Sequence, residues 1–179
     1  MNTMQILIAG FGGQGVLFAG KYLANQGLLE NKNVSWLPSY GPEMRGGTAN
    51  CSVIISSEPV GSPIVTEPDC LIAMNLPSLE KYKKLVKSGG MILVDSSLIN
   101  IKVQRDDIRV FYIPATKMAN ENGISTLANM ILIGKFLKEC PILSFKNTET
   151  TLSKIVSAKH ADLLEYNKKA LDTGYNYID

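Results

Sequence analysis

Short apolar runs alternate with longer segments of mixed polarity along this chain. Runs of about four to eight apolar residues predict buried strands, whereas apolar positions spaced by three and four residues predict helices with one buried face. The runs predict strands at residues 6–9, 34–37, 48–56, 69–75, 91–95 and 109–114. The mixed segments predict helices at 16–29, 78–87, 116–120, 126–140, 148–157 and 159–171. Strands and helices alternate over much of the chain, which indicates an α/β fold.

Two strands depart from this alternation. The 34–37 strand is closed by Pro38, and the 48–56 strand follows it without a crossover helix, so we expect the latter to pair antiparallel or to lie at an edge. The predicted fold class is therefore a single α/β domain over residues 1–179. Its sheet is mixed but mostly parallel and flanked by helices, with a glycine-rich first strand-to-helix turn and a helical C-terminal part at about 116–173.

The apolar faces of two predicted helices suggest how they pack. In the 78–87 helix we expect Tyr82, Leu85 and Val86 to form the buried stripe and the lysines to face solvent. The 126–140 helix has a broader face than one helix of a monomer needs, which predicts a subunit interface. Its apolar positions are Leu127, Met130, Ile131, Ile133 and Leu137.

Charge and length exclude several classes of function. The 179 residues carry 18 Lys and Arg against 16 Asp and Glu, so no basic surface points to nucleic acid as a partner. No apolar run is long enough to span a bilayer, and the first residues lack the cationic region of a signal peptide. We therefore expect a cytoplasmic protein without a membrane segment.

The cysteines do not form a metal-binding pattern. Cys51, Cys70 and Cys140 are isolated, with no Cys-x-x-Cys pair, and His160 is the only histidine. Such a set provides neither a zinc site nor an iron–sulfur site. We interpret the three thiols as small core residues in a reducing compartment.

The strongest candidate for chemistry is the turn between the first strand and the first helix. Gly10, Gly12 and Gly15 have the spacing G-x-G-x-x-G, and Gly13 and Gln14 lie between them. Backbone N–H groups at such a helix start are unpaired, and glycine lets a phosphate approach them closely. The turn therefore predicts an anion or nucleotide site, and the alternative is a glycine turn required for packing alone.

Two familiar nucleotide motifs fit this turn poorly. A dinucleotide site of the NAD type needs an acidic residue at the end of the second strand, where this chain has Ser39 and Tyr40. A P-loop would need Ser or Thr after Lys21, where Tyr22 stands. Lys21 lies in the predicted helix, and its long side chain either reaches an anion near the turn or is simply solvated.

A second turn, at residues 39–50, follows the second strand. Pro42 and three glycines shape it, and Arg45 supplies a planar fork that suits a phosphate or carboxylate. The alternative is a surface turn with an ion pair between Glu43 and Arg45. Asp95, with the serines after it, also ends a strand, where we favour a capping role over a ligand.

The two glycine stretches together, residues 10–16 (GFGGQGV) and 39–47 (SYGPEMRGG), resemble the gamma subunit or domain of 2-oxoacid:ferredoxin oxidoreductases. The 2-oxoglutarate and 2-ketoisovalerate types are the most similar. The resemblance covers nearly the whole chain, including the runs at 69–73, 89–96 and 129–134.

The resemblance implies oxidative decarboxylation of a 2-oxoacid to acyl-CoA and CO2, with electrons passed to ferredoxin. It places thiamine diphosphate with magnesium on partner subunits that bind the 2-oxoacid, and iron–sulfur clusters on a ferredoxin-like subunit. This chain alone binds none of these groups and supplies no catalytic residue. Contact with external ferredoxin occurs through the complex, and contact between two gamma chains is a further expectation.

By the same resemblance, this chain contributes part of the coenzyme A site. The residues implied at the glycine turn are Gly12, Gly13, Gln14, Gly15 and Lys21. The residues implied at the second turn, which would face the thiamine-binding subunits, are Ser39, Tyr40, Gly41, Arg45 and Gly46.

Two alternatives remain open. One is the smaller subunit of an indolepyruvate ferredoxin oxidoreductase, which carries a similar domain. The other, of a different class, is a free-standing nucleotide-binding module that regulates or scaffolds.

Overall fold

A computed structural model describes residues 2–39, 48–156 and 161–178 of the chain. Its centre is a six-stranded sheet in the order β2-β3-β1-β4-β5-β6. The strands are β1 (Thr3–Phe11), β2 (Asn33–Ser39), β3 (Thr48–Ser56), β4 (Cys70–Ala73), β5 (Met91–Asp95) and β6 (Arg109–Ile113). Only β3 runs against its neighbours, β1 and β2, so β1, β2, β4, β5 and β6 share one direction. The expected mixed, mostly parallel sheet is confirmed.

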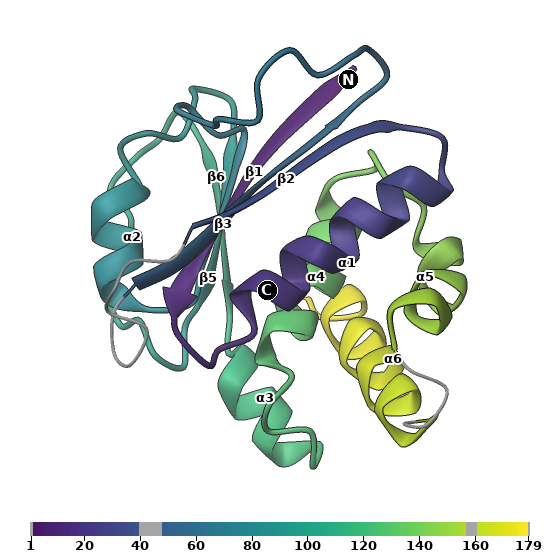
Figure 1. The fold of residues 1–179 in the computed structure, drawn as a ribbon. Coiled ribbons are helices and arrows are strands. Elements are labelled where there is room, and N and C mark those ends of the chain that lie inside the picture. Colours follow the sequence, from purple (N-terminus) through teal and green to yellow (C-terminus); the bar gives the residue numbers. More distant parts are fainter. Residues whose placement is uncertain (1, 40–47, 157–160, 179) are drawn as a thin grey trace.

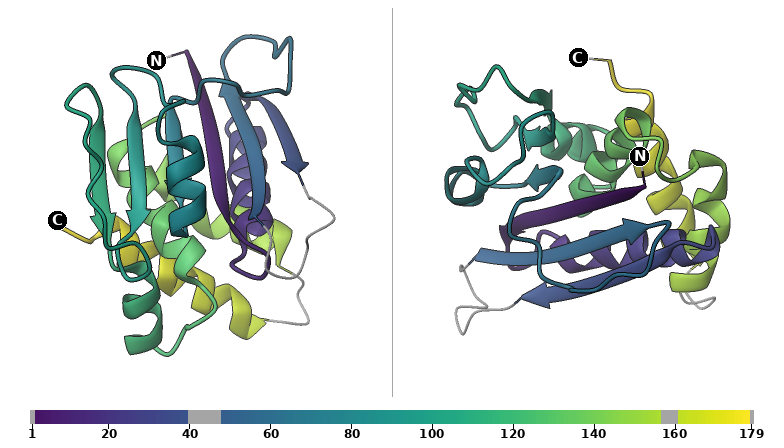
Figure 2. Two further views of the ribbon diagram at one scale, coloured as in Figure 1. Left: turned by 90° about the vertical axis from the view of Figure 1, so that its left-hand side faces the viewer. Right: turned by 90° about the horizontal axis from the view of Figure 1, so that it is seen from above.

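Helices cover both faces of the sheet, but unequally (Figure 1). The α-helices are α1 (Val16–Leu29), α2 (Leu76–Tyr82), α3 (Ala115–Glu121), α4 (Ala128–Glu139), α5 (Thr148–Ile155) and α6 (Ala161–Tyr175), with a short 3-10 helix at Phe145–Asn147. Only α2 lies on one face, and the other helices gather on the opposite face, as the two further views show (Figure 2).

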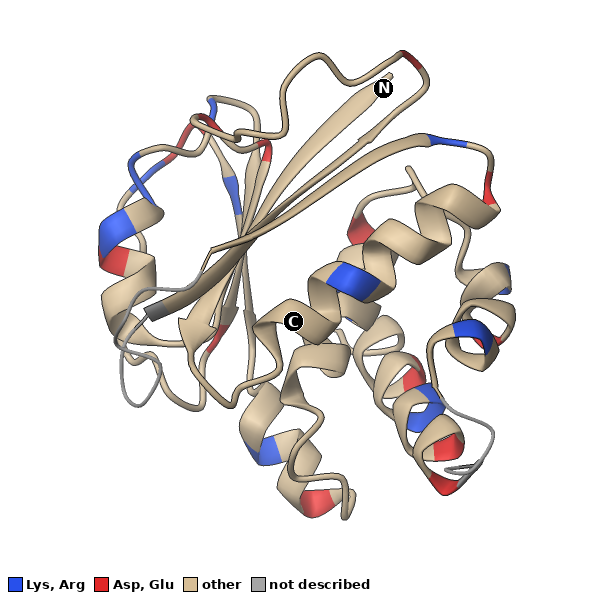
Figure 3. Ribbon diagram, viewed as in Figure 1, with Lys and Arg blue, Asp and Glu red and all other residues tan. Residues whose placement is uncertain are grey.

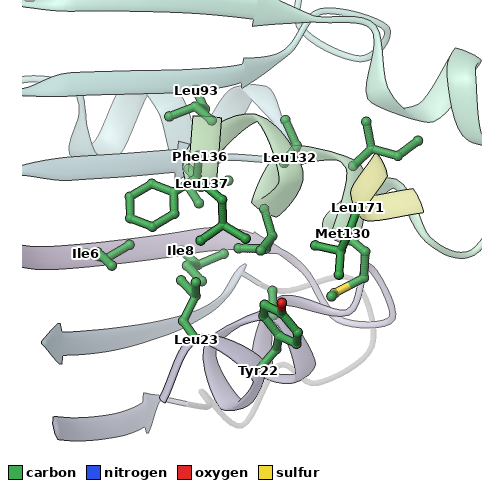
Figure 4. Packing of buried hydrophobic residues seen from close by; sticks show 14 of the residues in the cluster. Ile6, Ile8, Tyr22, Leu23, Leu93, Met130, Leu132, Phe136, Leu137 and Leu171 are labelled. Atoms are coloured by element: carbon green, nitrogen blue, oxygen red, sulfur yellow. The ribbon is translucent and has the colours of Figure 1, made fainter. Parts of the chain in front are cut away.

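This arrangement gives two apolar cores. The larger core lies between the sheet and helices α1, α4 and α6, and its side chains come from the sheet and from these helices (Figure 4). The smaller core lies under α2 and includes Leu71, Leu79 and Ile92. β4 and β5 are buried along their whole length because helices cover both of their faces.

The structure corrects one sequence-based expectation about strands and decides between the two alternatives left open for another. Pro38 does not close β2 but lies within it, paired opposite Cys51. β2 pairs only with β3 and is therefore an edge strand, where the missing N–H of proline is tolerated. β3 pairs antiparallel as expected, but it lies inside the sheet rather than at an edge.

Helix α2 is shorter than predicted. It ends at Tyr82, and the chain then continues in turns, so Leu85 is 43% exposed. The buried stripe contains Leu79 and, beyond the helix, Val86. Helical spacing fails to place Leu85 because the helix has already ended.

The predicted subunit interface on α4 is also wrong. Met130, Ile131 and Ile133 are fully buried within this single chain, and Leu137 is nearly so. The helix lies between the sheet and α6, so both of its sides are covered (Figure 4). Its excess of apolar residues reflects this double burial rather than contact with another chain.

Two glycines allow α4 and α6 to approach closely. A Cβ on Gly134 of α4 would overlap the carbonyl oxygen of Leu171, and a Cβ on Gly174 of α6 would overlap that of Ile131. Both obstacles are backbone atoms, which cannot rotate away. The two helices therefore pack backbone to backbone and hold α4 firmly against the sheet.

We predict that Gly174→Ala destabilises the fold, because the added methyl group must push the two helices apart. Overpacking of this kind costs about 1–3 kcal/mol, measurable as a lower urea midpoint. The matched control is Gly61→Ala, because a Cβ at Gly61 meets no atom within 4 Å. Equal midpoints for the two variants would contradict this account of the α4–α6 contact.

Candidate functional site

The glycine turn joins the central strand β1 to helix α1. Gly13 has φ +94° and Gly15 has φ +75°, values that L side chains rarely adopt. The N–H of Gln14 donates to the carbonyl of Phe11 (3.2 Å), which closes the turn. Gly12 and Gly13 are exposed. The turn therefore presents bare backbone to solvent in a shape that needs glycine at two of its positions.

Helix α1 begins without any side-chain cap. Its N-cap is Gly15, and the first turn contains no acidic residue. The first intrahelical bond runs from the N–H of Ala19 to the carbonyl of Gly15 (3.0 Å). The N–H groups of Val16, Leu17 and Phe18 consequently lack intrahelical acceptors, and they lie at the positive end of the helix dipole. This arrangement can bind an anion.

Gln14 has a structural role in the turn. Its Oε1 accepts the N–H of Phe11 (2.6 Å), and its Nε2 donates to the carbonyl of Met74 (3.0 Å). The first bond closes the turn on itself, and the second connects the turn to the residue after β4. The close fit also requires Gly10, because a Cβ there would lie 2.6 Å from Gln14 Oε1.

The turn lies where the direction of chain crossover changes. β1 and β4 are parallel neighbours, yet α1 after β1 and α2 after β4 lie on opposite faces of the sheet (Figure 1). Open α/β sheets bind ligands beyond the carboxyl ends of the strands at such a switch point. Asn75 lies shortly after β4, where its Oδ1 accepts the N–H of Ser78 and caps α2.

Lys21 lies about 7.5 Å further along the axis of α1 than Val16. Its side chain is exposed and forms no ion pair with any residue that the structure describes. It is the only charged residue of α1 and appears as the blue segment of that helix in Figure 3. The amino group is therefore available to an anion near the turn.

The structure does not bring Ser39 to the glycine turn. Ser39 pairs with Asn50, and Asn50 donates to the Tyr82 hydroxyl (3.2 Å), which places this row of side chains on the α2 face. Cys51, the next residue of β3, instead contacts the carbonyl of Val16 on the α1 face. Ser39 shares the edge of the sheet with the turn but not its face. Tyr40, Gly41, Glu43, Arg45 and Gly46 lie outside the described residues.

Asp95 is a cap, as the sequence favoured. Its carboxylate accepts the N–H of Ser97 (3.1 Å), the N–H of Thr116 (3.3 Å) and the hydroxyl of Thr116 (2.6 Å). The side chain is fully buried. These bonds tie the end of β5 to the start of α3.

Sequence reasoning missed one residue of this site. Asn129, in the first turn of α4, donates from Nδ2 to the carbonyl of Gly15 (3.0 Å) and is 3% exposed. The sequence feature that could have revealed Asn129 is a carboxamide within the apolar run 128–133. A polar group that is buried with such a run needs a hydrogen-bond partner.

The thiols are core residues, as predicted. Cys51, Cys70 and Cys140 are free and buried. Burial raises the pKa of the Cys51 thiol from about 9 to about 12, and burial likewise raises the pKa of Cys70 and Cys140. All three are therefore protonated near neutral pH, which removes them as nucleophiles.

Within 2–39, 48–156 and 161–178, no three His, Cys, Asp or Glu side chains are grouped so that they could hold a metal ion. Among the helices of these same segments, none has both the length and the apolar character needed to cross a membrane.

Comparison with known proteins places the chain. Residues 5–177 match the family described as pyruvate ferredoxin/flavodoxin oxidoreductase. The ketoisovalerate oxidoreductase subunit VorA of Methanothermobacter marburgensis is 44% identical over 133 residues, which are 74% of this chain and 28% of VorA. This chain thus spans much less than the full length of VorA. The 2-oxoglutarate synthase subunit KorC of Methanocaldococcus jannaschii is 34% identical, over 92% of this chain and 90% of KorC.

Solved structures show the same fold. The gamma subunit of a keto/oxoacid ferredoxin oxidoreductase from Geobacter sulfurreducens has a TM-score of 0.82 and 28% identity, over 96% of both chains. A 2-oxoglutarate:ferredoxin oxidoreductase from Magnetococcus marinus, with 2-oxoglutarate, coenzyme A and succinyl-CoA bound, has a TM-score of 0.87. Its identity is 24%, over 98% of this chain and 31% of that chain, so it is evidence for the fold alone.

The buried thiol of Cys51 leads to a prediction about pH. Because its pKa is about 9 when unfolded and about 12 when folded, ionisation above pH 9 favours the unfolded chain. The stability that the protonated thiol provides is complete below pH 9 and decreases as the pH rises towards 12, by up to about 1.4 kcal/mol per pH unit.

The Cys51→Ala variant lacks this contribution. The difference in unfolding free energy between wild type and Cys51→Ala should therefore shrink between pH 9 and pH 11, as measured by urea unfolding at each pH. The same free-energy difference at pH 7, where the thiol is protonated in both states, measures only the packing lost with the thiol. A difference that stays constant with pH would contradict the prediction.

Proposed function

The chain belongs to the pyruvate ferredoxin/flavodoxin oxidoreductase family, and we propose that it acts as the gamma subunit or domain of a 2-oxoacid:ferredoxin oxidoreductase. The resemblance to the gamma subunit is confirmed by the match over residues 5–177 and by the KorC relative. The reaction we propose is oxidative decarboxylation of a 2-oxoacid to acyl-CoA and CO2.

The observation that carries the proposal is the uncapped start of α1 at the carboxyl end of β1. Gly15 caps the helix without a side chain, and the exposed Gly12 and Gly13 leave room for a ligand. Free N–H groups at a positive helix end bind phosphate. We infer that this turn binds a phosphate group of coenzyme A, with Lys21 as a second cationic contact.

The rest of the coenzyme A site is proposed from the family resemblance. Ser39, Tyr40, Gly41, Arg45 and Gly46 would lie at the junction with the thiamine-binding subunits, and Arg45 would bind an anionic group. A protein of this fold, from Magnetococcus marinus, has coenzyme A bound. Since that likeness concerns the fold alone, coenzyme A binding by this chain rests on the glycine turn and on the family resemblance.

The redox chemistry is assigned to partner chains. We propose that they bind thiamine diphosphate with magnesium, the 2-oxoacid and the iron–sulfur clusters. Backbone N–H groups and one lysine are offered to a ligand at the described turn, and two carboxamides hold the turn in place. Such groups suit a subunit that binds and positions the acyl acceptor.

The 2-oxoacid we propose is 2-oxoglutarate or a branched-chain 2-oxoacid. The KorC relative is a subunit of a 2-oxoglutarate synthase, and VorA is a subunit of a ketoisovalerate oxidoreductase.

The proposal predicts that the isolated chain has no oxidoreductase activity. A complex purified through an affinity tag on this chain should reduce ferredoxin when given 2-oxoglutarate or 2-ketoisovalerate, thiamine diphosphate and coenzyme A. Removal of this chain from the complex should abolish acyl-CoA formation. Full activity without this chain would overturn the proposal.

Substitution of Lys21 or Arg45 by Ala should raise the KM for coenzyme A in that complex and leave the KM for the 2-oxoacid unchanged. Loss of a charge-assisted contact costs about 1.5–3 kcal/mol, which corresponds to roughly ten- to a hundredfold. Steady-state kinetics with each substrate varied in turn measure the difference.

The matched control is Lys84→Ala, which removes an exposed lysine beyond the end of α2, on the opposite face of the sheet. It should leave both KM values unchanged. If neither the Lys21 nor the Arg45 variant alters the coenzyme A dependence, those two assignments fail.

A further inference from the structure

Asn129 makes the long-range contact that holds the glycine turn from the α4 side. Its Nδ2 donates to the carbonyl of Gly15 (3.0 Å), a residue far away in sequence. The side chain is 97% buried, in a helix whose other buried residues are apolar except for Lys135. Such a carboxamide would be replaced by leucine at little cost if packing were its only role.

The fit between Asn129 and Gly15 is close. A Cβ on Gly15 would lie 2.8 Å from Asn129 Cγ and would overlap Nδ2. Gly15 is therefore required both by its φ of +75° and by the position of Asn129. The carboxamide lies directly against the residue that begins α1.

The other end of the carboxamide is unpaired. Asn129 Oδ1 is buried and has no hydrogen-bond partner among the described residues. A buried acceptor without a partner costs about 1–3 kcal/mol. At the glycine turn this cost accompanies a bond from Nδ2 to Gly15, which is the residue at the start of the proposed anion site.

That bond acts on the peptide group between Gly15 and Val16. The carbonyl of this peptide accepts two hydrogen bonds, from Asn129 Nδ2 and from the N–H of Ala19, each 3.0 Å long. The N–H of the same peptide belongs to Val16, the first helical residue, and has no intrahelical acceptor. Hydrogen bonds to the carbonyl polarise the peptide and strengthen its N–H as a donor, by roughly 10–30% per bond.

We propose that Asn129 is a positioning residue of the anion site: it fixes and polarises the Gly15–Val16 peptide so that the Val16 N–H binds a phosphate of the ligand. This inference deepens the proposed function and rests on it. Asn129 does not touch the phosphate itself. Its effect reaches the ligand through Gly15, and it therefore concerns phosphorylated ligands only.

The test uses Asn129→Leu and Asn129→Met, which fill the space of the carboxamide with apolar atoms and remove the hydrogen bond to Gly15. In the tagged complex, both variants should raise the KM for coenzyme A by about three- to tenfold. The KM for the 2-oxoacid and the thermal midpoint should stay unchanged.

The matched control is Asn167→Leu in α6. Asn167 is also buried, donates from Nδ2 to a backbone carbonyl (Leu163, 2.7 Å) and has an unpaired Oδ1. It belongs to α6 and makes no contact of this kind with the glycine turn. It should leave the coenzyme A dependence unchanged.

A second measurement needs no variant that must fold. In amide NMR spectra of the full wild-type chain, inorganic pyrophosphate and coenzyme A should shift the Val16 signal, whereas pantetheine, which has no phosphate, should not. The signal of Glu149, in the first turn of α5, should not move with any of the three.

The outcomes separate this inference from the proposed function. If Lys21→Ala raises the KM for coenzyme A but both Asn129 variants behave as wild type, the role of Asn129 is refuted and the proposed function stands. If the Asn129 variants change both KM values and the thermal midpoint together, the residue is merely structural and the inference fails. If wild-type Val16 does not respond to pyrophosphate or coenzyme A, this inference and the assignment of a coenzyme A phosphate to the glycine turn both fail, and the place of the chain in the complex stands.

Discussion

The constraint on which the site depends is the close contact between a backbone turn and the carboxamides on either side of it. β1 lies in the middle of the sheet, so the chain leaving it must turn at once into α1 in a crowded space. Gln14 attaches the turn to β4, and Asn129 attaches it to α4. Each carboxamide occupies space that only glycine leaves free, at Gly10 and at Gly15 respectively. Packing alone therefore requires these two glycines, and the ligand that we propose would meet the exposed backbone of Gly12 and Gly13 between them.

The C-terminal helices matter to this site through α4. Gly134 and Gly174 bring α4 and α6 into backbone contact, so α4 has little freedom to move relative to the sheet. Asn129, at the start of α4, is therefore held in place, and its hydrogen bond fixes the carbonyl of Gly15. A part of the chain that carries no recognisable motif thus determines how accurately the glycine turn is placed. Accurate placement is what makes hydrogen-bond donors effective towards a developing or bound charge.

The sequence predicted well where structure is local. The bounds of α1 and β5 follow from continuous patterns with glycine at the turns, and the cap at Asp95 follows from a short polar cluster. Prediction failed where the outcome depended on neighbours distant in sequence. Pro38 is tolerated inside β2 only because β2 is an edge strand, and the apolar surplus of α4 is buried by α6 rather than by another subunit. Asn129 was missed for the same reason, since its partner lies in a turn near the other end of the chain.

The chemistry of the described site is that of binding rather than bond making. The buried thiols have raised pKa values and stay protonated, and the only buried carboxylate among the described residues, Asp95, is fully used as a cap. Two kinds of group remain at the turn. The first N–H groups of α1 are dipoles fixed by the backbone, and Lys21 further along the helix carries a charge on a flexible side chain. Dipoles held in place by packing need no reorganisation when an anion arrives, whereas a flexible lysine must lose side-chain entropy to take part. In the site that we propose, the fixed N–H groups would therefore decide where the phosphate binds, and Lys21 would mainly strengthen its retention.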